Sequence, residues 1–360
     1  MEHSTKINSL QILSVLLICR FFTMLVAVPN NRYTLEGGDS LLIPFFSVAA
    51  MALLGIPLLL LMKRYPQQSF QQIVGELAPS WRKPVLIWQI LFCLLTAIGS
   101  ASQSEYFVAN ALYPNAKREY VIFLFLLVVW YMIAMGIEAI SRVSILVCGL
   151  IVLSFGLIFT GVFQQIDWLN ISSPFYEPIE KMAMTALSYW GQNTEILLLV
   201  LLQPYSRKQR FKKDFFTFLA GGLLITEILS FFSAAVLGSY GKTRMFPIYT
   251  LAALSGHGFF SRLDYLHIIN WTFACLLRCA IFSWAVDILL KDLFPKARPF
   301  FLQSAAVAII LGATLILSRF GDSFQWFYLI FASGIPVLIS VVLLPLFLLW
   351  KGRKRRKASV

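Results

Sequence analysis

Apolar runs of about 20 residues recur from one end of this chain to the other, and each is long enough to cross a lipid bilayer as a helix. Hydrophobic residues make up 59% of the 360 and charged residues only 13%, too few charges for the surface of a soluble protein of this size. A segment inside a bilayer must satisfy its own backbone hydrogen bonds, as helices do. The sequence therefore predicts an all-α polytopic membrane protein with a single transmembrane domain over residues 1–360.

The apolar runs fit about ten transmembrane helices, an even number that leaves both termini on one side of the membrane. Their approximate ranges are 9–28, 41–62, 85–112, 121–136, 143–163, 183–202, 215–237, 263–290, 300–317 and 324–350.

Loop charge predicts that this common side is the cytoplasm. With the N- and C-termini cytoplasmic, 20 of the 30 Lys and Arg residues fall in inner loops or the tail, and only 8 fall in outer loops. The basic cytoplasmic tail, residues 351–360, is expected to anchor the last helix against anionic headgroups of the lipid bilayer. The net charge of +13 thus requires no nucleic-acid partner.

The sixth run carries a polar segment, residues 188–195, in its middle. Polar groups at bilayer depth cost several kcal/mol, roughly, unless they face a protein interior or a water-filled cavity. Four of them follow a spacing of three, four and three residues, which predicts one shared helical face: Thr185, Ser188, Gln192 and Glu195. The third run has a similar stripe, formed by Thr96, Ser100, Gln103 and Asn110.

Two arginines lie deep in predicted spans, where each needs a partner because arginine keeps its charge. Arg20 lies midway along the first span and Arg278 lies within the eighth. One interpretation is a buried ion pair that fixes helix packing, and the other is a counter-charge for a carboxylate ligand or for ion coupling. The acidic candidates for Arg20 are Glu105, Glu195 and Glu227.

Other features set limits. The sequence contains no HExxH, GxSxG or phosphate-binding glycine loop, and its three histidines are scattered, so we expect neither an enzyme nor a metal or cofactor site. The outer segment 240–262 is too short to cross the membrane. It predicts either a re-entrant or surface-lying helix that caps a cavity, or an ordinary interfacial loop.

The first and sixth spans are five spans apart and both carry polar residues, a pattern typical of transporters built from a five-plus-five inverted repeat. Short motifs then follow in order along nearly the whole chain: Val28-Pro29, Lys63-Arg64-Tyr65-Pro66, Gln72-Ile73-Val74-Gly75-Glu76-Leu77, Ser104-Glu105-Tyr106-Phe107, Trp190-Gly191-Gln192-Asn193-Thr194-Glu195-Ile196 and Phe259-Phe260-Ser261-Arg262-Leu263-Asp264. With these motifs the chain resembles the spore germination receptor B subunit family, which belongs to the amino acid–polyamine–organocation superfamily of amino-acid permease-like proteins.

The resemblance implies nutrient sensing at the spore inner membrane, or in a bacterial cell membrane, beside an A-type membrane subunit and a C-type lipoprotein subunit. In one respect the chain departs from the pattern. Related transporters usually have glycine where the first helix unwinds, whereas this chain has Cys19-Arg20-Phe21-Phe22-Thr23, which puts a broken first span in doubt.

The first hypothesis is a receptor subunit that binds a small nutrient, an amino acid or similar zwitterion, midway through the membrane and signals germination by a population shift. We expect Tyr189, Gly191, Gln192 and Asn193 to contact the ligand, with Thr23, Ser100 and Gln103 facing it; Glu195 either orients the site or pairs with Arg20. The alternative is a secondary amino-acid transporter coupled to protons or sodium through Glu195 or Glu227. A third possibility is a structural subunit whose pocket is filled by Trp190 and Phe21-Phe22.

Overall fold

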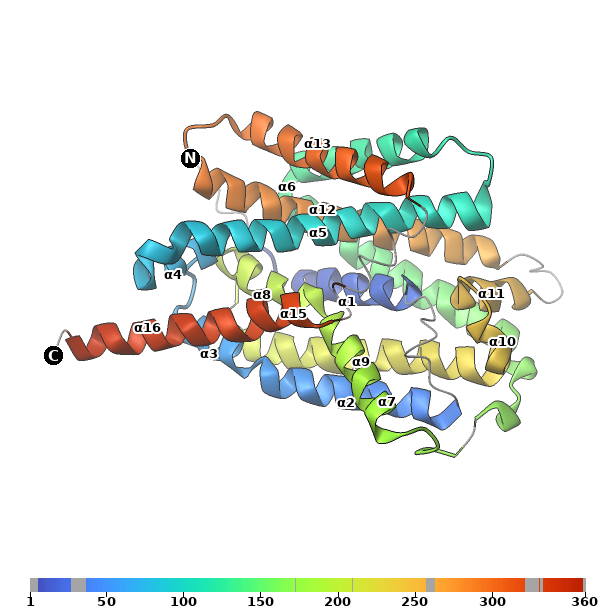
Figure 1. Ribbon diagram of the computed structural model, residues 1–360. Coiled ribbons are helices and arrows are strands. Elements are labelled where there is room, and N and C mark those ends of the chain that lie inside the picture. Colours follow the sequence, from blue (N-terminus) through green and yellow to red (C-terminus); the bar gives the residue numbers. More distant parts are fainter. Residues whose placement is uncertain are drawn as a thin grey trace.

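A computed structural model describes residues 6–26, 37–171, 173–208, 210–256, 263–320, 330 and 333–358. Its helices run side by side as an elongated bundle (Figure 1), and the only β-type pairing in the described residues is an isolated bridge between Ile7 and Ser206. The helices are α1 Ser9–Val26, α2 Gly37–Leu54, α3 Ile56–Arg64, α4 Phe70–Leu77, α5 Arg82–Phe107, α6 Arg118–Val162, α7 Ile179–Gly191, α8 Leu197–Leu202, α9 Phe211–Phe232, α10 Gly238–Lys242, α11 Pro247–Leu254, α12 Asp264–Leu293, α13 Pro299–Ser318, α15 Ile335–Val337 and α16 Leu344–Ala358.

Seven described helical segments are long and apolar enough to cross a membrane, and Ser9–Leu25 is a shorter apolar helix. The prediction of an all-α polytopic membrane protein is therefore confirmed. The predicted motifs Val28-Pro29 and Phe259-Phe260-Ser261-Arg262 lie outside the described residues, as does the start of the last predicted span.

Helix α6 covers two of the predicted spans. Its backbone leaves the helical conformation between them, at Gly136 (φ 81°, ψ 179°). Its first residue, Arg118, lies 3.3 Å from Glu105 in α5, measured from Nε to Oε1. Its last residue, Val162, packs in one cluster with Leu251 of α11, and α11 also reaches the end of α5. A straight helix of 45 residues would be about 68 Å long, so its ends could not meet there. The chain must reverse direction at Gly136.

We expect Gly136→Ala to lower the free energy of unfolding by about 1–3 kcal/mol, because its φ and ψ lie in a region that only glycine adopts readily. Space is not the cause, since a Cβ there would meet nothing within 4 Å. Gly149 and Gly156 are matched controls in the same helix, with equally open surroundings. Changing them to alanine should be neutral or stabilising. Thermal unfolding in detergent measures all three; equal effects would contradict the reversal at Gly136.

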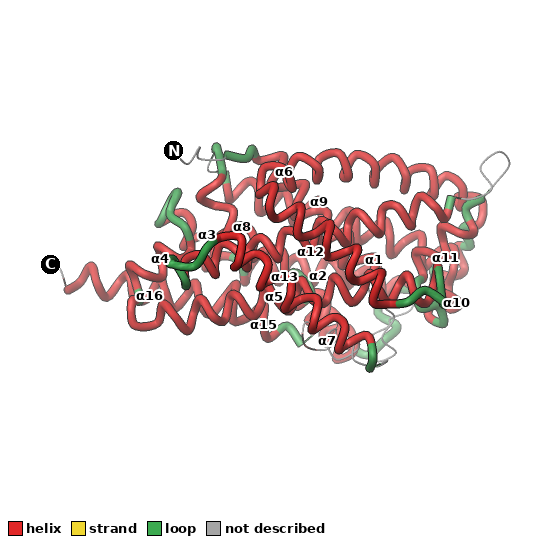
Figure 2. Tube along the Cα trace, turned by 90° about the horizontal axis from the view of Figure 1, so that it is seen from above, coloured by secondary structure: helices red, strands yellow, loops and turns green. Residues whose placement is uncertain are grey.

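Loops that the charge bias assigns to the inner side gather at one end of the bundle. Arg82, before α5, forms an ion pair of 2.7 Å with Asp292, after α12. The bridge between Ile7 and Ser206 joins the start of α1 to the end of the sixth span, and α16 packs on α3 and α4. Figures 1 and 2 show α16 projecting from this end, which we call the inner end.

The predicted outer loops gather at the opposite end. The carboxylate of Asp39 accepts hydrogen bonds from the backbone N–H groups of Phe175 and of Glu177, the latter 2.7 Å long. Arg118 donates to the backbone carbonyl of Ser318 at 2.9 Å. The alternation of ends therefore agrees with the predicted order of spans, while the assignment of the inner end to the cytoplasm remains a prediction from charge.

The two halves of the chain pack span against equivalent span. α5 packs on α12, α2 on α9, α6 on α13, and α1 on α8, so four spans lie against the span five positions later. Spans five positions apart run in opposite directions. This is the five-plus-five inverted-repeat arrangement that the sequence predicted.

The outer segment 240–262 begins with helices α10 and α11, so a helix at the surface, and not an ordinary loop, describes its first part; residues 257–262 are outside the described chain. Phe246, next to α11, packs edge-on against Phe107 at a centroid distance of 5.0 Å. Phe107 in turn stacks on Trp271 of α12 at 4.3 Å. These rings attach α11 to the outer ends of α5 and α12.

Candidate functional site

The sixth span is broken in the middle of the bundle. Helix α7 ends at Gly191, a single 3₁₀ turn covers Thr194–Ile196, and α8 follows. The side-chain amide of Asn193 donates to the backbone carbonyls of Tyr189 at 2.9 Å and Trp190 at 3.0 Å. An amide that takes up the last carbonyls of a helix competes with its continuation, which explains the stop at this point.

The helical face predicted for the sixth span therefore extends only to the break. α7 ends before Glu195, so a regular helical spacing cannot relate this residue to Thr185, and that part of the prediction is wrong. All four residues of the predicted face are nevertheless buried, and Gln192 donates to the hydroxyl of Ser188 at 3.3 Å. The polar segment faces protein, as its cost in lipid requires.

The first span is not broken. Helix α1 continues without interruption from Ser9 to Val26. This agrees with the absence of a glycine at the position where the first helix of related transporters unwinds. The hydroxyl of Thr23 donates to the carbonyl of Cys19 at 2.9 Å, the usual bond of a threonine inside a helix.

Arg278 connects three elements at this level of the bundle. From α12 its Nη1 donates to the carbonyl of Cys19 at 3.2 Å and to the hydroxyl of Thr23, and its Nη2 donates to the hydroxyl of Thr194 at 2.8 Å. Its guanidinium also lies over the ring of Phe22, 5.2 Å from the centroid. The side chain is only 7% exposed. Arg278 thus holds the first span and the break in the sixth span against the eighth.

Sequence reasoning found that Arg278 needs a partner but did not place it in the site. The partners are a backbone carbonyl and two hydroxyls. Such groups occur throughout a sequence, so they cannot be recognised there as partners of an arginine in the way that a carboxylate can. The only signal was the depth of a permanent charge in an apolar run.

Arg20 and Glu195 place opposite charges beside the break, and both side chains are at most 2% exposed. Of the three acidic candidates, Glu195 is the one whose charge acts on Arg20, and Arg278 acts on Glu195 as well. Nη1 of Arg20 and both carboxylate oxygens of Glu195 make no hydrogen bond of regular geometry within the described part of the chain, although the hydroxyl of Thr194 and the backbone N–H of Glu195 lie near that carboxylate. Charges that lack water or hydrogen bonds are costly to bury, so this arrangement requires an explanation.

The other two acids lie elsewhere. Glu105 pairs with Arg118 at the outer end of α5, at 3.3 Å, which makes Arg118 its counter-charge. Glu227 lies in α9, half-buried, and its Oε1 is buried without a hydrogen-bond partner among the described residues.

The remaining predicted residues fall in two places. Tyr189, partly buried at the end of α7, is close enough to Arg20 for an electrostatic interaction, and Gly191 ends that helix. Ser100 instead lies at the contact of α5 with α12. Its hydroxyl donates to the backbone carbonyl of Thr96 at 2.9 Å, and the thiol of Cys275 donates to the backbone carbonyl of Ser100 at 3.0 Å. Gln103, also buried in α5, has an Oε1 atom without a partner in the described residues.

Comparison with known protein families gives one assignment. The family described as "Spore germination protein" (Spore_permease) matches residues 6–323. No curated protein matches the sequence.

Solved structures of transporters share the fold. Mhp1, a nucleobase-cation-symport-1 family transporter in a closed conformation with bromovinylhydantoin bound, superposes with a TM-score of 0.63 at 12% identity, over 92% of this chain and 76% of Mhp1. A Na⁺-coupled sialic acid symporter in a substrate-bound outward-open state superposes with a TM-score of 0.62 at 14% identity, over 96% of this chain and 80% of the symporter. At such low identity these similarities establish the fold alone.

Proposed function

Because the chain belongs to the spore germination protein family and is a permease-like membrane protein, we propose that it is the membrane subunit of a nutrient-germinant receptor. In this proposal a small zwitterionic nutrient, such as an amino acid, binds at the break in the sixth span. Binding favours one of two packings of the bundle, and partner subunits detect the change as the germination signal.

The pair of buried charges beside the break carries this proposal. Arg20 and Glu195 have opposite charges that act on each other, and each has buried polar atoms without a hydrogen bond of regular geometry to the described residues. A guanidinium binds a carboxylate through parallel hydrogen bonds, and a carboxylate accepts from an ammonium group. The carboxylate of a zwitterion would therefore bind Arg20 and its ammonium group would bind Glu195, while Tyr189 and Gln192 contact the rest of the ligand.

A second candidate is a secondary amino-acid transporter, favoured by the fold and by the carboxylate of Glu227 inside a membrane-spanning helix. Coupling by sodium is the weaker form of this alternative. Broken helices of transporters coordinate Na⁺ with backbone and hydroxyl oxygens, and here the carbonyl of Cys19 and the hydroxyls of Thr23 and Thr194 already bind the guanidinium of Arg278. Uptake of an amino acid into proteoliposomes under an imposed proton gradient would favour this candidate.

The remaining parts of the proposal rest on the family and on charge. We assign the protein to the inner membrane of the spore, or to a bacterial cell membrane, with both termini cytoplasmic. Its partners would be an A-type membrane subunit and a C-type lipoprotein subunit.

We expect Gln192→Ala to raise the nutrient concentration for half-maximal germination by at least about tenfold, because a hydrogen bond to a charged ligand contributes about 1.5–3 kcal/mol. Asn110→Ala is a matched control, since Asn110 is exposed just beyond the end of α5 and its amide donates to the nearby backbone carbonyl of Tyr106. The measurement is the germination dose-response of spores with equal amounts of each variant. Identical curves for wild type and Gln192→Ala would place the ligand elsewhere.

A further inference from the structure

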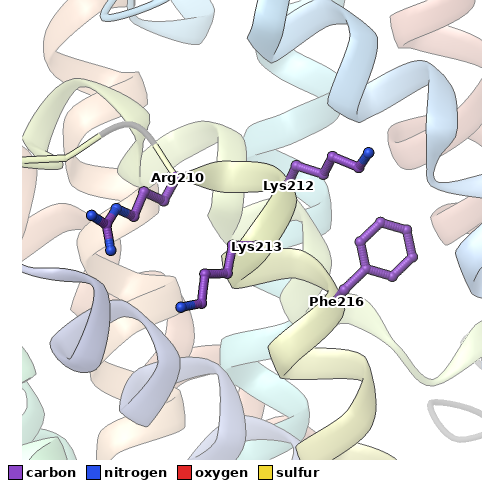
Figure 3. A pocket seen from close by; sticks show the side chains of 4 residues that line it. All are labelled: Arg210, Lys212, Lys213 and Phe216. Atoms are coloured by element: carbon purple, nitrogen blue, oxygen red, sulfur yellow. The ribbon is translucent and has the colours of Figure 1, made fainter.

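An open hollow of about 490 Å³ lies at the inner end of α9, and three cations and one aromatic ring line it. In Figure 3 the side chains of Arg210 and Lys213 extend together on one side of the first turn, while Lys212 and Phe216 extend on the other. All four residues are exposed. The hollow belongs to neither the break in the sixth span nor the residues around it.

Little negative charge offsets these cations. In the described residues, none of the three forms an ion pair. The adjacent acid, Asp214, is 2% exposed, and its carboxylate points inward, where it accepts a hydrogen bond of 3.3 Å from Ser9. The three cations outnumber the single charge of Asp214, so the hollow keeps an excess of positive charge on its outward-facing surface.

An apolar face continues from the hollow along α9. Lys212, Phe216, Ala220 and Leu224 follow one another at intervals of four residues, so they share one side of the helix. All four are exposed, Phe216 by 44% and Leu224 by 60%, and the segment is one that can span a membrane. The cations therefore lie at the inner end of this apolar face, where we expect the headgroups of phospholipids.

We propose that this hollow binds the phosphate of an anionic phospholipid, with an acyl chain against the face that Phe216 and Leu224 form. A phosphate oxygen accepts well from Lys212, which extends on the same side of the helix as Phe216 (Figure 3), while Arg210 and Lys213 add positive charge at the same turn. The continuous apolar surface favours a lipid over a soluble acidic peptide, which would leave that surface uncovered. The inference is independent of the proposed receptor function.

The test is retention of lipid by purified full-length protein, measured by native mass spectrometry after exchange into mixed micelles of phosphatidylglycerol and phosphatidylcholine. The variant is Lys212→Gln with Lys213→Gln, two of the cations that line the hollow. The control removes the same charge at the same end, outside the hollow: Lys296→Gln with Arg298→Gln, both exposed. Each cation near the phosphate contributes about a factor of five, so we expect binding of phosphatidylglycerol to weaken about twenty-five-fold in the variant. The loss should be clearly smaller in the control, whose two cations lie outside the hollow and do not contact the bound phosphate.

Equal retention by wild type, variant and control would overturn the site. Competition by free glycerol phosphate at equal concentration would overturn the lipid as its occupant, because a soluble phosphate lacks the acyl chain. If the double variant does not fold, Lys212→Gln alone tests the same contact, with an expected loss of about fivefold.

Discussion

Replacing Arg278 with leucine is expected to lower the free energy of unfolding by about 3–5 kcal/mol, the usual cost of removing one partner from a buried charged network. The change would leave the hydroxyl of Thr194 without its donor and would remove one of the two cations that act on Glu195. It would also remove the hydrogen bonds that join α1 and the break in the sixth span to α12. Thermal unfolding of the purified protein in detergent measures the loss.

Arg142→Leu is the control for this variant, because Arg142 is 70% exposed and pairs only with Glu138 on its own helix. We expect it to change stability by less than about 0.5 kcal/mol. Arg278→Lys should recover only part of the loss, since an ammonium cannot reproduce the planar fork that reaches both spans. An Arg278→Leu protein as stable as wild type would contradict the role given to this residue.

The second large effect is expected from a double-mutant cycle on the buried charges, Arg20→Met and Glu195→Gln. Each single change leaves the other charge buried and should cost about 3–5 kcal/mol. The double variant has neither charge, so its loss should be smaller than the sum of the single losses by about 1–3 kcal/mol. Arg142→Met with Glu138→Gln, an exposed pair, is the control cycle and should show a coupling of about 0.3–0.5 kcal/mol.

The same cycle separates a structural pair from a ligand site. If Arg20 and Glu195 serve only to hold helices together, a stable double variant should germinate like wild type. If they bind the two ends of a nutrient, the double variant should be folded and assembled but unresponsive. Additive losses of stability would show that the two side chains do not act on each other.

Much of the fold could be predicted because the bilayer limits what an apolar chain can do. Run lengths and loop charges gave an order of spans that agrees with the two ends of the bundle, including the contacts of Asp39 with Glu177 and of Arg82 with Asp292. The polar segment of the sixth span was visible in the sequence, and its burial could be predicted because such a segment must face protein, but the break itself was not predicted.

The details of the site depend on side-chain geometry that the sequence does not encode locally. The helical spacing from Thr185 to Glu195 assumed a continuous helix, but α7 ends at Gly191. The partner of Glu105 is Arg118, which lies beyond the end of its own span, so no periodicity could identify it. Arg278 was predicted to need a partner, yet its partners come from two other spans.

The central claim is that a nutrient binds between Arg20 and Glu195 at the break in the sixth span, and equilibrium binding tests it most directly. A panel of labelled amino acids would be added to purified wild type and to the stable double variant Arg20→Met with Glu195→Gln, each alone and with its partner subunits. We predict saturable binding of at least one amino acid to wild type and none to the double variant. Equal binding to both proteins, or no binding to wild type even with its partners, would contradict the claim.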